Sequence, residues 1–468
     1  MSLIEAPTRS SRRWLALTVL ALAQFLVVLD ASIVNIALPS LGADLGLDTA
    51  GLGWVITAYI LTFGGLLLLG GRLADRYGHR RLFLVGTLGF VVASAVAGLS
   101  VSGEMLLAAR ALQGLSAALL APASLALVTT LFVTTADRAK ALGIWGAVAG
   151  IGSAAGVLLG GVLTGAFGWQ SVFFVNLPIG LVVLVAIPFL VTRDPRQERT
   201  RLDLAGAATI TLGLAALVGT LSSAEQNGFV DVTTLALAAA AVALLAAFVA
   251  IEKRTASPLV DFAIFRSKSV TAGNLAILLA GAAMVGLFFA LSVYLQAVLG
   301  YDALAAGLSQ LPLAGALVIV AGIIPPVVTR FGARRVLVVA LLVFAAGLLW
   351  LAQAPSDAGF VAHLLGPTLI IGAGIGGAFI AATQLAVDDV SDADSGLAGG
   401  LVNTSQQIGG ALGLAILSTV AAARTDALQS AGASAADAMT SGLSWMFVGA
   451  AIAAVAASIV AAVVRERR

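Results

Sequence analysis

The chain has 468 residues, of which 60% are hydrophobic and 10% are charged. Soluble domains carry roughly 25% charged residues, so a soluble fold of this size could not cover its surface with so few. The net charge of +2 gives no argument for nucleic acid as a partner, and the lack of cysteine excludes disulfides and thiolate chemistry. The composition therefore predicts an all-α membrane protein whose main solvent is the lipid bilayer.

Apolar segments long enough to cross a bilayer follow one another along nearly the whole chain. A spanning helix needs about 20 predominantly apolar residues. The first six predicted spans cover 14–38, 51–71, 82–101, 105–132, 139–165 and 169–191. Two more cover 203–223 and 231–251, and the last six cover 269–298, 303–328, 335–353, 359–386, 396–423 and 441–464. The sequence thus predicts fourteen transmembrane helices.

The basic residues alternate from loop to loop in step with these spans. If the N-terminus is cytoplasmic, every basic residue except Arg110 and Arg424 falls in a cytoplasmic loop or end, as the positive-inside rule requires. Arginine far outnumbers lysine, and alanine and glycine are abundant, which indicates a GC-rich bacterial genome. We therefore expect a multi-pass protein of the bacterial cytoplasmic (inner) membrane, with both termini cytoplasmic.

An internal repeat supports this layout. The sequence RYGHRR at 76–81 returns as RFGARR at 330–335, and each copy joins the second and third helices of a six-helix set. This predicts two six-helix pseudo-repeats, 1–192 and 255–468, separated by a loop and two inserted helices at 193–254. Parallel repeats with a binding site between them at the bilayer midplane are typical of secondary transporters.

Two ionisable residues, Asp30 and Arg110, lie clearly inside predicted spans. At about 1.5 Å per residue, Asp30 is about 24 Å along its helix from the cytoplasmic side, and Arg110 enters from the outside by about 9 Å. Both reach the outer half and could meet if they face one cavity. Because such residues are costly in a membrane, they are candidate functional residues. A static ion pair that fixes helix packing is the alternative.

The residues favour a coupling role over a static one because no other buried acid is evident in the spans. Burial disfavours a charged carboxylate, whereas a nearby arginine favours it. Asp30 would then take a proton from outside and release it when Arg110 or a cationic substrate approaches. Competition of proton and substrate for one charge would give antiport.

Several motifs occur in order along the chain. They are LDASIVNIALP at 29–39, GRLADRYGHRR at 71–81, RALQG at 110–114, the glycines Gly152, Gly156, Gly160 and Gly161, YLQ at 294–296, and the stretch 396–413 with Asn403. Together they resemble the major facilitator superfamily and, within it, the fourteen-span drug:proton antiporters of multidrug efflux. Two positions depart from the pattern: Val157 stands where the helix 5 motif usually has proline, and Gln406 where arginine is common.

The resemblance implies roles for individual residues. It assigns proton coupling to Asp30 and Arg110, and it implies that Asp75 braces the cytoplasmic ends of the two halves. The first turn of the thirteenth span, near Ser395, would suit such an anion. The neighbouring arginines Arg76, Arg80 and Arg81 and the helix 5 glycines Gly152, Gly156 and Gly160 join the predicted gating set. Cytoplasmic anchoring by the arginines and close helix packing by the glycines are the simpler interpretations.

Polar and aromatic residues in other spans are candidates for a substrate cavity. Gln113 lies one turn from Arg110 and shares its helix face. The remaining candidates are Asn35, Trp54, Tyr59, Asn274 and Asn403. For the asparagines, an interhelical hydrogen bond explains the residue as well as ligand contact does. Periodicity does not decide whether Trp54 and Tyr59 line a cavity or face lipid.

Motifs of other protein classes are not found. There is no P-loop for a pump, no His-Glu-x-x-His zinc site and no Gly-x-Ser-x-Gly elbow, and His79 and His363 lie at opposite ends of the predicted bundle. We therefore expect no enzyme activity, no cofactor and no metal site. The predicted function is proton-driven export of lipophilic drugs or toxic small molecules by a monomer. Export of a specific endogenous metabolite, siderophore or peptide is the alternative.

An acidic segment precedes the thirteenth span. It contains Asp388, Asp389, Asp392 and Asp394 and no basic residue. Two interpretations stay open: a solvated loop, or a cytoplasmic latch that pairs with the arginines of 72–81 or 330–335.

Overall fold

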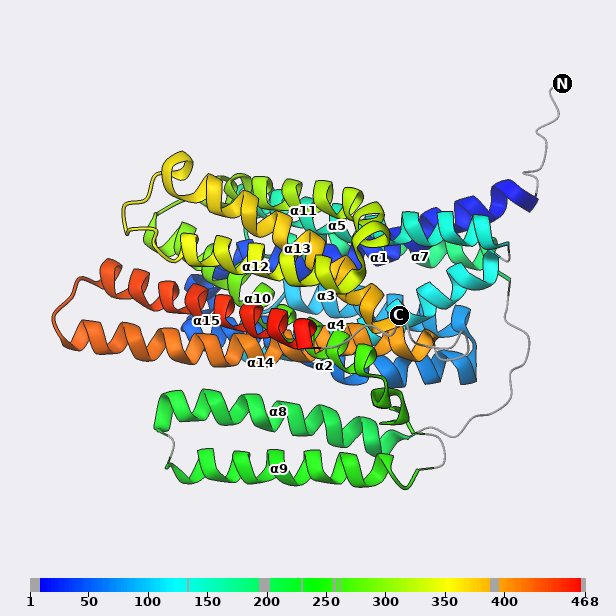
Figure 1. Ribbon diagram of the computed structural model, residues 1–468, viewed down its shortest axis with the longest axis horizontal. Helices are drawn as coiled ribbons and strands as arrows, with labels where there is room; N and C mark the ends of the chain where they lie inside the picture. Colours follow the sequence, from blue (N-terminus) through cyan, green and yellow to red (C-terminus); the bar gives the residue numbers. More distant parts are fainter. Residues whose placement is uncertain are drawn as a thin grey trace.

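The computed structural model describes residues 9–132, 134–192, 203–228, 230–255, 258–260, 262–387 and 395–463. Throughout these ranges the ordered elements are helices, and no strand occurs. Most helices run side by side along the long axis of the molecule (Figure 1). This arrangement confirms the predicted all-α class.

The helices follow the predicted spans closely. The first half contains α1 (Arg9–Leu45), α2 (Thr49–Tyr77), α3 (His79–Gly98), α4 (Gly103–Leu131), α5 (Thr135–Phe167), α6 (Ser171–Phe174) and α7 (Asn176–Leu190). The inserted pair is α8 (Leu204–Asn227) and α9 (Val232–Glu252). The rest contains η1 (Phe262–Arg266), α10 (Lys268–Val293), η2 (Tyr294–Val298), α11 (Ala303–Phe331), α12 (Ala333–Leu351), η3 (Phe360–Leu364), α13 (Leu365–Val387), α14 (Ser395–Ser430) and α15 (Ala435–Val463).

The described helices agree with a fourteen-span protein. Among them, 13 are long and apolar enough to cross a membrane, with α6 and α7 counted as one, and α5 contributes a shorter apolar stretch at Ala155–Phe167. The sixth span is broken at Val175, between α6 and α7. α5 continues as one helix past Val157, the position at which the family motif usually has proline.

The repeated basic motif builds the same turn twice. Gly78 ends α2 with φ 98° and directly precedes α3, and Gly332 ends α11 with φ 87° and directly precedes α12. Positive φ is accessible to glycine without steric cost, so both tight helix-to-helix turns depend on it. The end of the bundle that carries these two turns is called the basic end below.

Small residues let the two halves approach each other. A Cβ atom on Gly161 of α5 would lie 2.6 Å from the carbonyl oxygen of Ala303, and one on Gly307 of α11 would lie 2.7 Å from that of Val157. These contacts lie away from the basic end, near the α5–α6 and α10–α11 connections. α2 and α14 form a second contact, at Gly64 and Gln407. Close backbone approach is the usual way in which helices associate without a hydrophobic driving force.

The inserted helices α8 and α9 lie against each other at the margin of the bundle, beside α2 and α14 (Figure 1). The predicted boundary at 192/193 falls next to residues 193–202, which lie outside the described residues. The division of the chain into 1–192, 193–254 and 255–468 stays a prediction.

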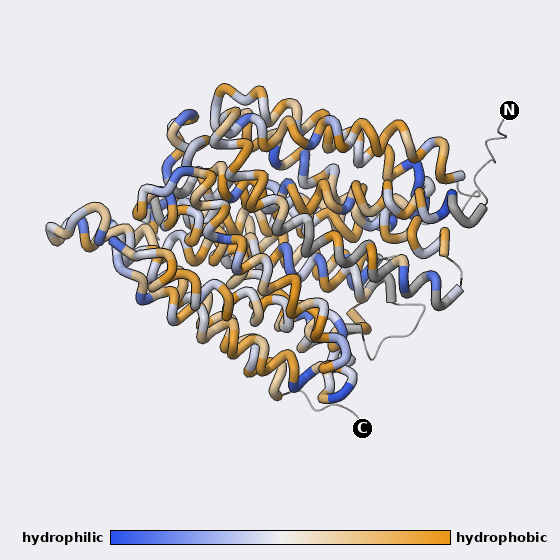
Figure 2. The backbone as a smooth tube through the Cα atoms, turned by 90° about the horizontal axis from the view of Figure 1, so that it is seen from above, coloured by the Kyte–Doolittle hydropathy of each residue, from blue (hydrophilic) through white to orange (hydrophobic). Residues whose placement is uncertain are grey.

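Apolar side chains cover much of the outer surface. Phe189, Ile319, Ile323 and Val339 are among the large hydrophobic residues that are exposed. Along the tube in Figure 2, hydrophobic residues occupy the lengths of the helices, while hydrophilic ones gather mainly at their ends. A hydrocarbon solvent explains this exposure, because apolar patches of this extent are rare on soluble monomers.

We expect Gly70→Ala to destabilise the protein by roughly 1–3 kcal/mol through overpacking. Its new Cβ atom would lie 1.9 Å from the carbonyl oxygen of Ala118, so α2 and α4 would have to separate. Gly53→Ala on the same helix is the matched control, because a Cβ atom there meets nothing within 4 Å. The thermal-unfolding midpoints of both purified variants test this, and equal midpoints would contradict it.

Candidate proton and substrate site

Asp30 of α1 and Arg110 of α4 are in direct contact inside the helix bundle. The guanidinium Nη1 donates to Asp30 Oδ2 over 2.6 Å, and the two residues are 0% and 1% exposed. Their positions along the predicted spans put them at similar depth from opposite membrane faces. Their orientation toward each other depends on the way α1 and α4 pack, which only the structure supplies.

Every hydrogen-bond partner of the Asp30 carboxylate is a donor. Arg110 donates to Oδ2, while the amide nitrogens of Gln113 and Asn176 donate to Oδ1 over 2.9 and 2.8 Å. One of these three donors is charged, and charge-assisted hydrogen bonds are the stronger kind. This surrounding offsets the large cost of removing the charge from water.

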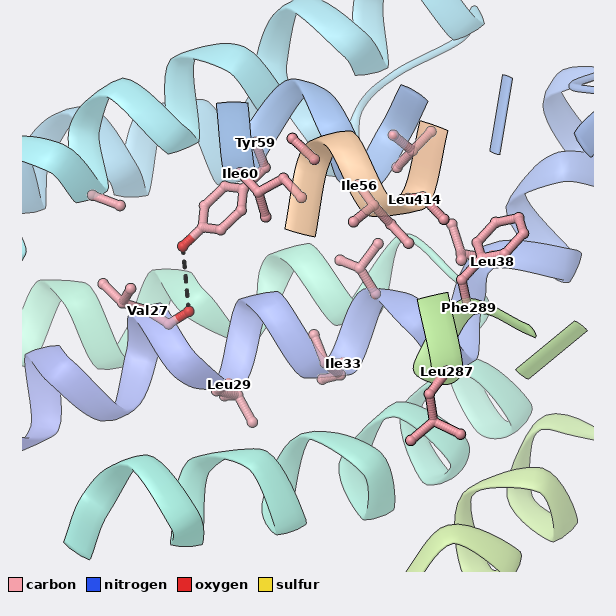
Figure 3. Packing of buried hydrophobic residues seen from close by; sticks show 14 of the residues in the cluster. Val27, Leu29, Ile33, Leu38, Ile56, Tyr59, Ile60, Leu287, Phe289 and Leu414 are labelled. Atoms are coloured by element: carbon pink, nitrogen blue, oxygen red, sulfur yellow. Dashed lines mark hydrogen bonds between the residues drawn. The ribbon is translucent and has the colours of Figure 1, made fainter. Parts of the chain in front are cut away.

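The guanidinium of Arg110 also has several polar and aromatic partners. Its Nε donates to the carbonyl oxygen of Val55, and its Nη1 also donates to Gln113 Oε1. Its guanidinium carbon lies 4.4 Å from the centre of the Tyr59 ring, close enough for a cation–π interaction. The Tyr59 hydroxyl donates to the carbonyl oxygen of Val27 on α1 over 3.4 Å (Figure 3). Tyr59 and Gln113, both predicted cavity residues, thus belong to the Asp30–Arg110 cluster.

Two members of this cluster were missed in the sequence. Asn176 is 0% exposed at the start of α7, and Ser94 of α3 is 0% exposed beside it. The Ser94 hydroxyl accepts hydrogen bonds from Gln113 Nε2 and Asn176 Nδ2 over 2.8 and 3.3 Å. Asn176 Oδ1 is buried without a hydrogen-bond partner. The available signal was that Asn176 is an amide inside the predicted span 169–191 and is followed there only by apolar residues.

The helix that carries Asp30 is held on two sides. On the first side, α5 packs its glycines on α1: a Cβ atom on Gly156 would lie 2.6 Å from Ser32 Cβ, and one on Gly160 would lie 2.9 Å from the carbonyl oxygen of Ile33. Gly152 makes a similar contact with Val28. The predicted gating glycines therefore lie directly on the turns that flank Asp30. Their role in gating stays a prediction.

On the second side, α1 contacts the other half of the protein. The Ser292 hydroxyl of α10 donates to the carbonyl oxygen of Asn35, and Gln296 Nε2 of η2 donates to that of Ile36 over 3.0 Å. The side-chain amide of Asn35 donates to Ala31 within its own helix. The described hydrogen bonds of Asn35 therefore join α1 to itself and to α10.

The remaining predicted cavity residues lie apart from Asp30. The Trp54 indole N–H donates to Ser222 on the inserted helix α8 over 3.2 Å, in a pocket that Thr57 and Ser418 also line. Asn274 donates to Val270 and accepts from the Ser405 hydroxyl of α14 over 3.0 Å. The Asn403 amide donates to Gly399 in its own helix. Their assignment to a substrate cavity stays a prediction.

The predicted gating residues gather at the basic end. Asp75 lies 3.2 Å from His79 Nε2, its described partner, and its side chain is exposed. Arg80 donates to the carbonyl oxygen of Pro188 in α7, Arg76 lies over the Tyr77 ring, and Arg81 is exposed. The sequence predicted that Asp75 contacts the first turn of α14. The described residues show no such interaction, so this contact stays a prediction.

Two further expectations concern acidic residues and metals. The acidic segment with Asp388, Asp389, Asp392 and Asp394 lies outside the described residues. Within the described part of the chain, no group of three or more potential metal-ligating side chains occurs.

Comparison with known proteins decides the family. The family model described as Major Facilitator Superfamily matches residues 20–414. The chain belongs to the Major Facilitator Superfamily. It is 42% identical to the puromycin resistance protein of Streptomyces alboniger, over 89% of this chain and 83% of that protein. It is also 42% identical to the cephamycin export protein of Amycolatopsis lactamdurans, over 89% and 87% of the two chains.

More distant relatives and solved structures are also resistance proteins or transporters. The multidrug resistance protein Stp of Mycobacterium tuberculosis (strain ATCC 25618 / H37Rv) is 34% identical over 87% of this chain and 76% of that protein. Among solved structures, a mutant of the nucleoside transporter NupG aligns with TM-score 0.65 and 13% identity, covering 95% of this chain and 99% of that one. The peptide transporter PepTSo aligns with TM-score 0.68 and 15% identity, covering 95% and 96%. At such identities the structures establish the superfamily fold alone.

We expect Asn176→Leu to destabilise this superfamily member by about 1–3 kcal/mol, because it removes a donor from a buried charged carboxylate and leaves Ser94 with one partner fewer. Asn403→Leu is the matched control, since its exposed amide bonds only within its own helix among the described contacts. Thermal-unfolding midpoints in detergent measure the difference. A midpoint for Asn176→Leu at or above that of Asn403→Leu would contradict the assignment.

Proposed function

We propose that this protein exports lipophilic drugs or other toxic small molecules across the bacterial cytoplasmic membrane in exchange for protons. It would act as a monomer with both termini in the cytoplasm. The observation that carries the proposal is the Asp30 carboxylate, which is 0% exposed and bonded to Arg110, Gln113 and Asn176.

The chemistry of this carboxylate supports proton coupling. When Asp30 takes up a proton, its new O–H meets a surrounding of donors, and Arg110 loses its only described anionic partner. The protonated state therefore favours a different arrangement of α1 and α4, in which the O–H finds an acceptor or water. An ion that is stable in one arrangement and a neutral acid that is stable in another provide the two states that an antiporter needs.

The contacts of α1 suggest how the proton state reaches the rest of the protein. α1 packs on the glycines of α5 and its carbonyl groups accept hydrogen bonds from Ser292 and Gln296 of the second half. Besides the contact of α2 with α14 at Gly64 and Gln407, the halves thus meet through α1 at positions away from the basic end. In the proposed cycle, protonation of Asp30 loosens this contact and allows the two halves to rock.

The relatives support export of small molecules. Their names mention resistance to puromycin, export of cephamycin, and multidrug resistance. An apolar bundle with the Asp30 carboxylate at its centre suits neutral drugs and lipophilic monovalent cations. Arg110 is engaged by Asp30 in this structure, so binding of an acidic drug would require Asp30 to be protonated first.

Asp30→Asn should abolish proton-driven transport while the protein still inserts and folds. Asparagine keeps the shape of the side chain and an acceptor for Arg110, but its amide neither takes up nor releases a proton at physiological pH. Proteoliposomes with an imposed pH gradient measure drug uptake and proton flux together. Asp48→Asn is the control, because Asp48 caps α2 through its bond to the Gly51 amide and asparagine caps equally well. Wild-type exchange by Asp30→Asn would refute the coupling role.

A second candidate function is export of one endogenous metabolite. It is favoured by relatives whose names mention single compounds, such as the cephamycin export protein and the tetracenomycin C resistance and export protein.

The resistance profile of a drug-sensitive strain that expresses the protein separates the two candidates. For multidrug export we expect at least a fourfold rise in inhibitory concentration for compounds of several unrelated scaffolds, and an uncoupler should remove it. The Asp30→Asn protein, expressed to the same level, is the transport-inactive control. Protection against one scaffold only would favour the metabolite exporter.

A further inference from the structure

A second pair of buried acids lies where the inserted helices meet the bundle. Asp203 directly precedes α8, and Glu252 is the last residue of α9, so the antiparallel packing of the two helices brings them together at the basic end. Asp203 is 5% exposed and Glu252 is 3% exposed. Neither residue belongs to the Asp30 cluster.

Each of the two carboxylates accepts a hydrogen bond at only one of its oxygens. The Gly206 amide donates to Asp203 Oδ1 over 2.6 Å, and the Val260 amide donates to Glu252 Oε2 over 3.1 Å. Asp203 Oδ2 and Glu252 Oε1 are buried without a hydrogen-bond partner. Both of these oxygens lie beside the same space, at 2.6 and 2.7 Å from the point where a Cβ atom on Gly206 would sit.

Among the described residues, no basic side chain bonds to these two oxygens. Arg72 of α2 lies close enough to Glu252 for an electrostatic interaction, but its described hydrogen bond goes to the carbonyl oxygen of Pro258 over 3.1 Å. Lys253 and Arg254, which follow Glu252, are exposed. Asp75 and Arg76 lie about one turn farther along α2. On its other side the pair adjoins an apolar cluster formed by Ala207, Phe248, Leu259, Val260 and Leu401.

Helix capping explains one oxygen of Asp203 but not the second. Asp231, the N-cap of α9 at the far end of the same hairpin, shows the contrast. It is partly exposed and bonds the amides of Thr233 and Thr234, and the Thr233 amide is the main cause that lowers its pKa. Two carboxylates buried together without a bonded cation cost several kcal/mol per ion, so such a pair normally takes up a proton or a metal ion.

We propose that Asp203 and Glu252 form a binding site for one monovalent cation, a proton or a sodium ion, held between their two unpartnered oxygens. The charges of the described residues support a single positive charge: two carboxylates lie beside one space, and Arg72 of α2 is the guanidinium described near them. This site is independent of proton transfer at Asp30.

The bound cation would fasten the inserted hairpin to the transport bundle. Glu252 and Arg72 hold the same short segment, 258–260, through the amide of Val260 and the carbonyl oxygen of Pro258. Arg72 is one turn from Asp75 and Arg76, near the turn that leads into α3. Occupancy of the site therefore controls how firmly α8, α9 and the connection to α10 are held against α2. This assigns a role to the two helices that the six-helix repeats do not account for.

The test uses the full-length protein in lipid nanodiscs and follows its thermal unfolding. In the first arm, NaCl replaces choline chloride at constant ionic strength and pH 7.5. In the second arm, the pH is varied from about 5 to 9 without sodium. Glu252→Gln is the key variant, because its amide donates to Asp203 Oδ2 in place of the cation. Asp203→Asn is the second variant, and Asp231→Asn is the matched control, since it changes a partly exposed cap of the same hairpin.

We expect a saturable rise of about 3 °C or more in the wild-type midpoint, driven by sodium or by protons. Glu252→Gln and Asp203→Asn should lose that rise, and Asp231→Asn should keep it. A sodium-dependent rise identifies the ion as sodium. A rise that appears only on acidification, and that is larger in the wild type than in Glu252→Gln, identifies a proton. If sodium has no effect and the pH profiles of the wild type and both variants coincide, the site does not exist.

Discussion

The structure depends on one buried carboxylate that is surrounded by hydrogen-bond donors. Asp30 receives bonds from Arg110, Gln113 and Asn176, which come from α4 and α7, and all four side chains are 1% exposed or less. Buried ion pairs of this kind add little net stability, because desolvation cancels most of the attraction. Removing the charge is a different matter, since it leaves a buried guanidinium without its anion. The arrangement is therefore sensitive to a single proton.

That sensitivity matters because of what α1 touches. The turns on either side of Asp30 pack directly on the glycines of α5. Because glycine has no side chain that could change rotamer, a shift of α1 there must be taken up by the α5 backbone. Farther along the same helix, two carbonyl oxygens accept bonds from Ser292 and Gln296 in the second half. A small shift of α1 thus changes contacts within the first half and between the halves. In the proposed cycle, these are the surfaces along which the two halves would rock.

The sequence was sufficient for the spans and for the depth of the central pair. Spans follow from hydropathy, and depth follows from the fixed rise of a helix, so Asp30 and Arg110 could be brought to one level. Which neighbouring helix a side chain points toward could not be predicted in this way. Trp54 turned out to bond Ser222 of α8, because nothing in its periodicity indicates which neighbour a helix face meets.

Other residues were missed for a related reason. Asn176 and Ser94 are uncharged polar residues in largely apolar spans, and their importance arises only when α3 and α7 pack beside α4. Asp203 and Glu252 lie 49 positions apart at helix ends, where acids are usually solvated or serve as caps. Only the antiparallel hairpin brings them together. Pairing between helices is thus the part of the site that one sequence cannot supply.

The most direct measurement of the central claim is proton release on substrate binding. Purified protein in weakly buffered detergent solution is mixed with the compound to which it confers the strongest resistance, and the pH change is followed at a series of starting pH values. Competition at Asp30 predicts net proton release by the wild type, up to about one proton for each substrate bound, and none by Asp30→Asn. Substrate binding by the wild type with no proton release across the whole pH range would contradict the account.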